Sequence, residues 1–207
     1  CTMLGFTMTD AAIEKKVLQE MLSDIVKDTY NMVSVDGDTS TNDMVTVLCN
    51  GMAGNKEITE ENEDFATFMK VLNTVNVYLS RRIVADGEGA TKMLECKVSG
   101  AKTKEDARIV AKSVVCSSLL KAAMFGADAN WGRVLCAIGY SGANVDVNKI
   151  DVSFESNDDR IGPLKSILQG AASGGRKNII IYITSNRRHM IKETFSDRSD
   201  EIHASDT

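Results

Sequence analysis

The sequence has 207 residues, of which 43% are hydrophobic and 26% are charged, a balance typical of a soluble globular protein that buries a core. Its formal net charge of -5 and its 5% of aromatic residues argue against a nucleic-acid-binding protein, which more often presents a basic face. No apolar run approaches the roughly 20 residues that span a bilayer, and no signal-peptide pattern opens the chain. We therefore expect no membrane segment.

The cysteines and histidines argue against a disulfide framework and a metal centre. The five cysteines are Cys1, Cys49, Cys96, Cys116 and Cys136. Their odd number, with no Cys-X-X-Cys pair, predicts buried free thiols in a reducing compartment. The two histidines, His189 and His203, lie near the end of the sequence, so no His-rich metal cluster is available and we expect no metal.

The first quarter of the chain predicts a strand and then a helix. Residues 2–9 combine threonine with apolar side chains, a pattern typical of a strand. Apolar residues recur at helical spacing from about residue 11 to residue 30, and we expect Thr9 or Asp10 to cap this helix. A short apolar run at residues 44–49 predicts a buried strand.

The middle of the chain continues this alternation. Acidic residues between positions 59 and 63 favour a helix N-terminus, because the helix dipole attracts negative charge. An apolar stripe extends that helix from Phe65 to Ile83. The later predicted elements are a strand at 93–99, a helix from Thr103 with an apolar face to Leu120, an apolar run at 134–138, and strands at 150–154 and 178–184. This interleaving predicts an α/β (α+β) fold.

The last stretch differs in composition from the rest. Residues 158–207 hold five of the nine arginines, both histidines and the only proline, Pro163. The change suggests a separate tail or a segment altered relative to its relatives. We therefore divide the chain into a region of residues 1–156 and an atypical C-terminal tail of residues 157–207.

Three loops are more polar than turns alone require. They are residues 36–43, residues 86–92 and residues 128–133. Taken singly, each is explained by the preference of Gly, Asp and Asn for turns. Gly87 and Gly89 do not make a dinucleotide-binding fingerprint, because no third glycine follows and no strand leads in.

Thr2 is a candidate nucleophile. A threonine hydroxyl reacts at neutral pH only when a base takes its proton, and a free N-terminal amine can be that base. The sequence does not begin with Met, so we expect a processed product or a fragment. By position alone the indication is weak, since any fragment can begin near a threonine.

Four blocks of sequence, taken together and in order, resemble the ornithine acetyltransferase (glutamate N-acetyltransferase) family. The blocks are Cys1–Phe6 with Thr9–Ala11, Val35–Asp43, Asp86–Lys92, and Asn130–Arg133 with Gly139–Gly142. They cover roughly residues 1–156. The resemblance implies the layered helix/sheet sandwich of that family, with this chain as its β-chain half.

The resemblance also implies roles for individual residues. The family's precursor cuts itself just before a threonine, which leaves an upstream α chain and a downstream β chain. By this resemblance Thr2 is the cleavage residue, a substrate-binding residue and the acetyl-accepting catalytic nucleophile. Cys1 is then the last residue of the α half, and Glu88 binds the substrate amine. If Cys1 stays attached, Thr2 lacks the free amine that the mechanism needs.

The implied reaction transfers an acetyl group from N-acetylornithine to glutamate through an acetyl-threonine intermediate, in the arginine biosynthesis of the cytoplasm. The implied assembly is a heterotetramer of two α and two β chains. Neither a metal nor a redox cofactor is required. Acetyl-CoA is a further acetyl donor in bifunctional members of the family, and the sequence fits both kinds.

Two alternatives remain open at this point. Related threonine- or serine-nucleophile aminopeptidases hydrolyse amides, with water in place of glutamate. The chain is alternatively an inactive fragment, because the family's C-terminal asparagine and threonine, which bind substrate, have no recognisable match in the tail. For this reason Asn186, Thr194 and Thr207 receive no such role.

Overall fold

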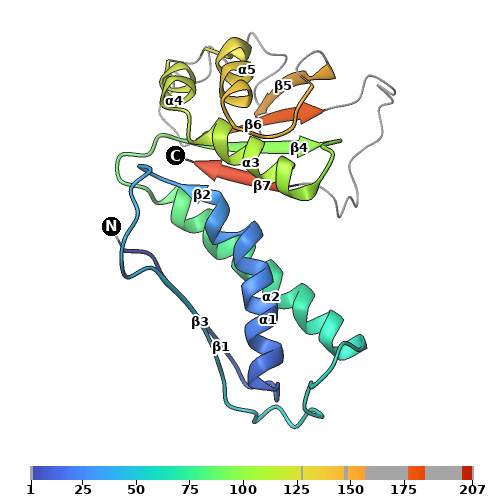
Figure 1. Cartoon of the computed structure of the whole chain (residues 1–207). Coiled ribbons are helices and arrows are strands. Elements are labelled where there is room, and N and C mark those ends of the chain that lie inside the picture. Colours follow the sequence, from blue (N-terminus) through green and yellow to red (C-terminus); the bar gives the residue numbers. More distant parts are fainter. Residues whose placement is uncertain (1, 127, 147–148, 157–176, 185–201, 207) are drawn as a thin grey trace. The chain divides into compact units, whose positions relative to one another are not determined.

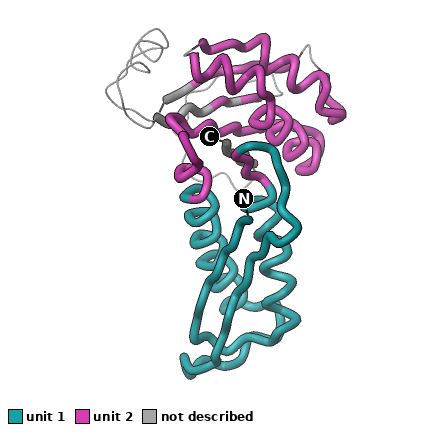
Figure 2. The backbone as a smooth tube through the Cα atoms, turned by 90° about the vertical axis from the view of Figure 1, so that its left-hand side faces the viewer, with its two compact units in different colours: residues 1–31, 36–82 teal, residues 32–35, 83–207 magenta. Residues whose placement is uncertain are grey.

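The computed structural model describes residues 2–126, 128–146, 149–156, 177–184 and 202–206. The chain forms two compact units, one of residues 1–31 and 36–82 and one of residues 32–35 and 83–207 (Figure 2). Each unit combines helices with a sheet, which confirms the predicted mixture of α and β structure. Within the described ranges, no helix has the length and apolarity needed to cross a membrane.

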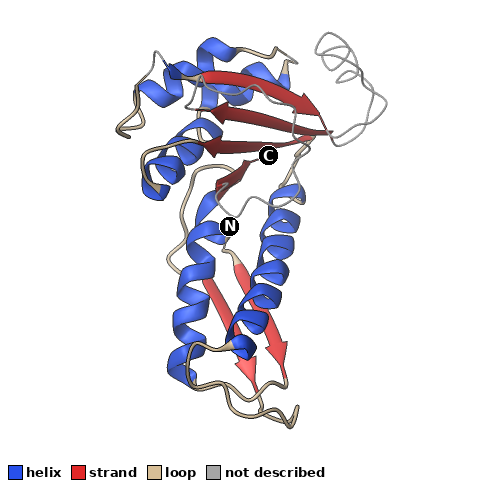
Figure 3. Cartoon of the chain, turned by 90° about the vertical axis from the view of Figure 1, so that its right-hand side faces the viewer, coloured by secondary structure: helices blue, strands red, loops and turns tan. Residues whose placement is uncertain are grey.

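Unit 1 is built on two parallel strands and two helices. Its elements are β1 (Leu4–Thr9), α1 (Lys15–Asp28), β3 (Met44–Cys49) and most of α2 (Glu63–Ala85), with the short 3₁₀ helix η1 (Tyr30–Met32) following α1. Strands β1 and β3 pair in register from Leu4 opposite Met44 to Thr9 opposite Cys49. Figures 1 and 3 show these strands running alongside α1 and α2.

The two faces of this small sheet differ. One face turns toward a core made of Val17, Met21 and Ile25 with Ile58 and Leu72, against which Val47 also packs. Since successive side chains of a strand alternate between faces, the other face carries a set of exposed apolar side chains. These are Leu4 (55% exposed), Phe6 (54%), Met8 (79%), Met44 (43%) and Leu48 (52%), and we call them the outer apolar face.

Helix α1 begins later than the sequence suggests. Its N-cap is Glu14, whose side chain makes no capping hydrogen bond, so the prediction that Thr9 or Asp10 caps it is wrong. The preceding residues are extended instead. Ile13 pairs with Ile58 in a parallel bridge, and the Glu14 N–H donates to the Ile58 carbonyl at 3.0 Å. This tertiary pairing outweighs the local preference for a cap.

Unit 2 is a five-stranded mixed sheet with helices. Its strands are β2 (Val33–Ser34), β4 (Lys92–Ser99), β5 (Asp151–Ser156), β6 (Lys177–Thr184) and β7 (Ile202–Asp206), in the order β2-β7-β4-β6-β5. Its helices are α3 (Lys104–Val115), α4 (Ser118–Phe125) and α5 (Trp131–Gly139). Strand β6 confirms the strand predicted at 178–184, whereas β7 was not anticipated. Most of the predicted tail, residues 157–207, lies outside the described residues.

The helices of unit 2 pack on its sheet through one continuous core. Its members include Leu94, Cys96 and Val98 from β4, Val110 and Val114 from α3, Leu120 and Met124 from α4, Val134 and Ile138 from α5, and Ile181 and Ile183 from β6. The single helix predicted from Thr103 to Leu120 is in fact two. The first ends at Val115 with Cys116 as its C-cap. Ser117 caps the second, because its hydroxyl accepts from the Leu120 N–H at 3.3 Å.

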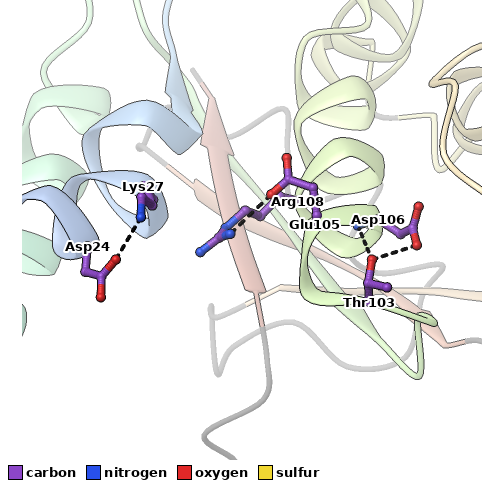
Figure 4. Close-up of polar contacts among 6 residues, drawn as sticks. All are labelled: Asp24, Lys27, Thr103, Glu105, Asp106 and Arg108. Atoms are coloured by element: carbon purple, nitrogen blue, oxygen red, sulfur yellow. Dashed lines mark hydrogen bonds and ion pairs between the residues drawn. The ribbon is translucent and has the colours of Figure 1, made fainter.

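Helix α3 begins with a reciprocal cap, shown in Figure 4. The Asp106 N–H donates to the Thr103 hydroxyl at 3.0 Å, and that hydroxyl donates to the Asp106 carboxylate at 2.7 Å. The Asn144 N–H donates to the same carboxylate at 3.2 Å. These hydrogen bonds lower the pKa of Asp106, and the one from the Thr103 hydroxyl has the largest effect.

Candidate active site

Thr2 lies directly before β1 and is exposed, with its hydroxyl held by a second hydroxyl. The oxygen Oγ1 of Thr2 is 2.9 Å from Oγ of Ser40, a hydrogen-bonding distance at which either atom can donate. Cys1, predicted to lie on the other side of the cleavage site, falls outside the described residues.

The residue after Thr2 is fixed through its backbone. The Met3 N–H donates to Oδ1 of Asp43 at 2.9 Å, and the Met3 carbonyl accepts from the Met44 N–H at 2.9 Å. The pairing of β1 with β3 therefore begins immediately after Thr2. Thr2 thus lies two residues before β1, and hydrogen bonds join Thr2 and Met3 to Ser40 and Asp43 of the polar loop and to Met44 of β3.

The loop of residues 36–43 has a defined internal structure. Gly37 adopts a φ of 84°, a left-handed conformation that residues with a side chain rarely adopt. The Asp38 N–H donates to the Asp36 carboxylate at 2.9 Å, and the Asn42 N–H donates to the Ser40 hydroxyl at 3.1 Å. Sequence reasoning singled out this loop but assigned no residue in it a role. The available signal was that the loop leads directly into the strand that pairs with β1.

Strand β1, which follows Thr2, packs closely against Tyr30 of η1. Gly5 is buried, and a Cβ atom at this position would lie 3.3 Å from the Tyr30 hydroxyl. That hydroxyl is buried and has no hydrogen-bond partner among the described residues. Burial also raises the pKa of Tyr30. A tyrosine held neutral under Gly5 leaves β1 little room to shift.

Glu88, the predicted substrate-binding residue, lies on an exposed turn of unit 2. The Ala90 N–H donates to the Gly87 carbonyl at 3.0 Å and closes a four-residue turn. Gly89 has φ 71° at its third position, the conformation that a type II turn requires there. The turn presents the Glu88 carboxylate to solvent. Glu88 belongs to unit 2, whereas Thr2 belongs to unit 1.

The third polar loop is explained by turn and cap formation. Asn130 caps α5, since its side-chain oxygen accepts from the Arg133 N–H at 3.1 Å. Its amide nitrogen donates to the Asp128 carboxylate at 2.9 Å. Trp131 follows on the first turn of the helix and is 64% exposed.

The four cysteines that the structure describes are free, as predicted, but only one of them is buried. Cys96 is fully buried, whereas Cys49 is half-buried and Cys116 and Cys136 are exposed. Burial, and to a lesser degree the neighbouring Glu95 carboxylate, raises the pKa of the Cys96 thiol far above its usual range. Cys96 is therefore an unreactive core residue. Among the described residues, no three His, Cys, Asp or Glu side chains are grouped so as to hold a metal ion.

Comparison with known proteins shows which family the chain resembles. The ArgJ family pattern matches residues 1–180 and so extends beyond residue 156 into the predicted tail. The arginine biosynthesis bifunctional protein ArgJ 1 of Clostridium acetobutylicum is 55% identical over 160 residues, which cover 77% of this chain and 39% of that protein. ArgJ of Caldanaerobacter subterraneus is 54% identical over 155 residues, which cover 75% of this chain and 38% of that protein.

A solved structure gives the same result. The crystal structure of the arginine biosynthesis bifunctional protein ArgJ from Bacillus halodurans is 38% identical and superposes with a TM-score of 0.80. The match covers 99% of this chain and 93% of that chain. The chain thus spans about two fifths of the length of the full-length relatives. On the sequence match over residues 1–180 and on the shared fold, the chain belongs to the ArgJ family.

Proposed function

We propose that this chain is the β subunit of a glutamate N-acetyltransferase, which moves an acetyl group from N-acetylornithine to glutamate in arginine biosynthesis. The observation that carries the proposal is the Thr2 hydroxyl, held by Ser40 at the head of β1 in a member of the ArgJ family. The relatives' names, which place them in arginine biosynthesis, support the pathway. The enzyme works in the cytoplasm.

Thr2 is the nucleophile of both half-reactions. Its Oγ1 attacks the acetyl carbonyl of N-acetylornithine, the C–N bond to ornithine breaks, and ornithine leaves with the proton that Thr2 gave up. The base is the α-amine of Thr2, set free when the bond to Cys1 is cut. Such proton transfer typically contributes about 10²–10⁴-fold. The amine of glutamate then attacks the acetyl-threonine ester and regenerates the hydroxyl.

Glu88 binds the cationic substrate. An exposed carboxylate on a closed turn suits the ammonium group of ornithine, because a carboxylate accepts charge-assisted hydrogen bonds from an ammonium group. Neither a metal nor a redox cofactor takes part. The tail, residues 157–207, has no assigned part in the chemistry, which we place in residues 1–156 and the partner chain.

The partner is an α chain from the same precursor, in a heterotetramer of two α and two β chains. The outer apolar face of unit 1 supports such a partner, since five large apolar side chains on one strand pair are exposed. The relatives are also much longer than the region they share with this chain. The α chain supplies donors for the oxyanion, each worth about 10²–10³ in rate.

The proposal is tested by product analysis of the chain produced together with its α chain. With N-acetylornithine and glutamate we expect N-acetylglutamate and ornithine in equal amounts, with none from Thr2→Ala and a reduced rate from Thr2→Ser. Acetate formed without glutamate would instead identify an amide hydrolase. A folded complex that yields neither product would be an inactive fragment. Acetyl-CoA in place of N-acetylornithine separates bifunctional from monofunctional members.

A further inference from the structure

We propose that Ser40, in the loop of residues 36–43, is the residue that positions the Thr2 hydroxyl for attack. The inference rests on the proposed function, since it requires Thr2 to be the nucleophile. Its starting point is the 2.9 Å distance between Thr2 Oγ1 and Ser40 Oγ, across 38 residues of sequence.

The other hydrogen bonds of Ser40 are compatible with Ser40 as the donor in this contact. A serine hydroxyl has one donor hydrogen and two acceptor sites. One acceptor site of Ser40 is filled by the Asn42 N–H at 3.1 Å. Its hydrogen can point to Thr2 Oγ1, which lies 2.9 Å away, a contact in which either oxygen can be the donor. In the proposed arrangement Ser40 donates to Thr2, and the hydrogen of Thr2 stays available for its own base.

This arrangement orients the reacting oxygen. Threonine is β-branched, and its Oγ1 occupies one of a few staggered positions about the Cα–Cβ bond. A donor fixed at 2.9 Å selects one of them. The same donor stabilises negative charge on Oγ1 as its proton passes to the α-amine. When the acetyl C–O bond forms, the Ser40 hydrogen stays on Ser40, so Ser40 positions Thr2 without exchanging a proton.

Two further hydrogen bonds, both made by the backbone of Met3, help to fix the position of Ser40 relative to Thr2. The Met3 N–H donates to the Asp43 carboxylate at 2.9 Å, and the Met44 N–H donates to the Met3 carbonyl at 2.9 Å. Three hydrogen bonds thus join the loop end to Thr2 and Met3. A misplacement of about 1 Å in a reacting group costs roughly 10²-fold in rate, so a device that fixes Oγ1 has a measurable effect.

The test compares Ser40→Ala with Ser40→Thr and with the control Thr41→Ala, all in the complex with the α chain. Thr41 is a matched control, because its hydroxyl donates to the Asn42 side chain at 3.1 Å and not to Thr2. The rate of acetylation at Thr2 is measured by peptide mass spectrometry, with N-acetylornithine and separately with p-nitrophenyl acetate.

We expect S40A to acetylate Thr2 about 10- to 100-fold more slowly with both acetyl donors, with an unchanged KM for N-acetylornithine. We expect S40T to recover most of the rate and T41A to match the parent. If S40A does not fold, Ser40→Cys, which keeps the size and weakens the donor, replaces it. A parent rate in S40A, or a rise in KM without loss of kcat, would overturn the proposal.

The two acetyl donors separate this inference from the proposed function. If the parent is acetylated at Thr2 by p-nitrophenyl acetate but not by N-acetylornithine, the proposed reaction fails. The role of Ser40 is then still decided by comparing S40A with the parent in p-nitrophenyl acetate. If N-acetylornithine acetylates the parent and S40A equally well, the reaction stands and the role of Ser40 fails. If neither donor acetylates Thr2, both proposals are wrong.

Discussion

The two units of the chain differ in how completely they bury their own apolar surface. In unit 2 the strands β4, β5 and β6 and three helices share a continuous core in which several side chains are fully buried. In unit 1 the two-stranded sheet has one face on a smaller core and the outer apolar face exposed. The nucleophile we propose, Thr2, stands at the edge of that second arrangement. The comparison teaches that unit 2 buries its apolar surface internally, whereas unit 1 leaves exposed the outer apolar face that we propose as the surface for the α chain.

The largest effect on stability is expected in the core of unit 2. Leu120 is fully buried, so Leu120→Ala should lower the free energy of unfolding by about 2–5 kcal/mol, as urea denaturation would measure. The neighbouring Leu119 is 56% exposed, and Leu119→Ala should change it by less than about 0.5 kcal/mol. Equal losses for the two variants would mean that the core of unit 2 is not the source of its stability.

A substitution on the outer apolar face should separate binding from stability. Phe6 is 54% exposed, so Phe6→Ser should leave the unfolding of the isolated chain nearly unchanged. The Phe6→Ser variant should bind the α chain with a free energy weaker by about 2 kcal/mol, roughly a 30-fold higher Kd, because large aromatic side chains dominate the binding energy of interfaces. Calorimetric titration measures this.

The matched control is Tyr78→Ser, which removes an aromatic side chain that is 62% exposed on α2 and not on the strand pair. It should bind the α chain with the affinity of the parent. Unchanged affinity in the Phe6 variant would remove the outer apolar face as the binding surface.

The cap of α3 should have a smaller and pH-dependent effect. Thr103→Ala removes the cap, at a cost of about 1 kcal/mol, and also the hydrogen bond that most lowers the pKa of Asp106. A carboxyl with a lowered pKa in the folded state stabilises above its unfolded pKa and loses that contribution as the pH falls through its folded pKa. The difference between parent and variant should therefore shrink in acid, as unfolding curves at neutral and acidic pH would show. A difference that grows in acid would contradict this account of Asp106.

The smallest effect is expected at the ion pair of α1, which Figure 4 also shows. Nζ of Lys27 lies 2.8 Å from the Asp24 carboxylate, and both side chains are more than half exposed. Solvent screens such pairs, so Asp24→Asn should change the free energy of unfolding by less than about 0.5 kcal/mol. Thermal unfolding in low and high salt would detect a larger, salt-dependent contribution if the pair mattered more.

Local patterns in the sequence predicted much of the fold. The alternation at 93–99 and the apolar run at 44–49 identified β4 and β3, because strand periodicity is a property of neighbouring residues. The prediction that β3 is buried was wrong, since Met44 and Leu48 are exposed. The start of α1 and the break at Ser117 were missed. The first depends on the pairing of Ile13 with Ile58, and the second on a single serine cap within an apolar pattern. Neither is visible in periodicity.

The candidate site shows the same limit. The sequence indicated Thr2 through its position and through a family resemblance, and it marked the loop of residues 36–43 as unusually polar. It did not single out Ser40, because the contact with Thr2 spans 38 residues and exists only once β1 pairs with β3. Glu88 keeps the role that the resemblance gave it as a prediction, now on a turn whose geometry is explained by Gly89.

The central claim is that Thr2 carries the acetyl group. The most direct measurement is the mass of the peptide that begins at Thr2, taken after the complex with the α chain meets N-acetylornithine alone and again after glutamate is added. The account predicts a chain that starts at Thr2 and gains one acetyl group on that residue, which glutamate removes. A chain that keeps Cys1, or a cleaved chain in which Thr2 never gains the acetyl group, would contradict it.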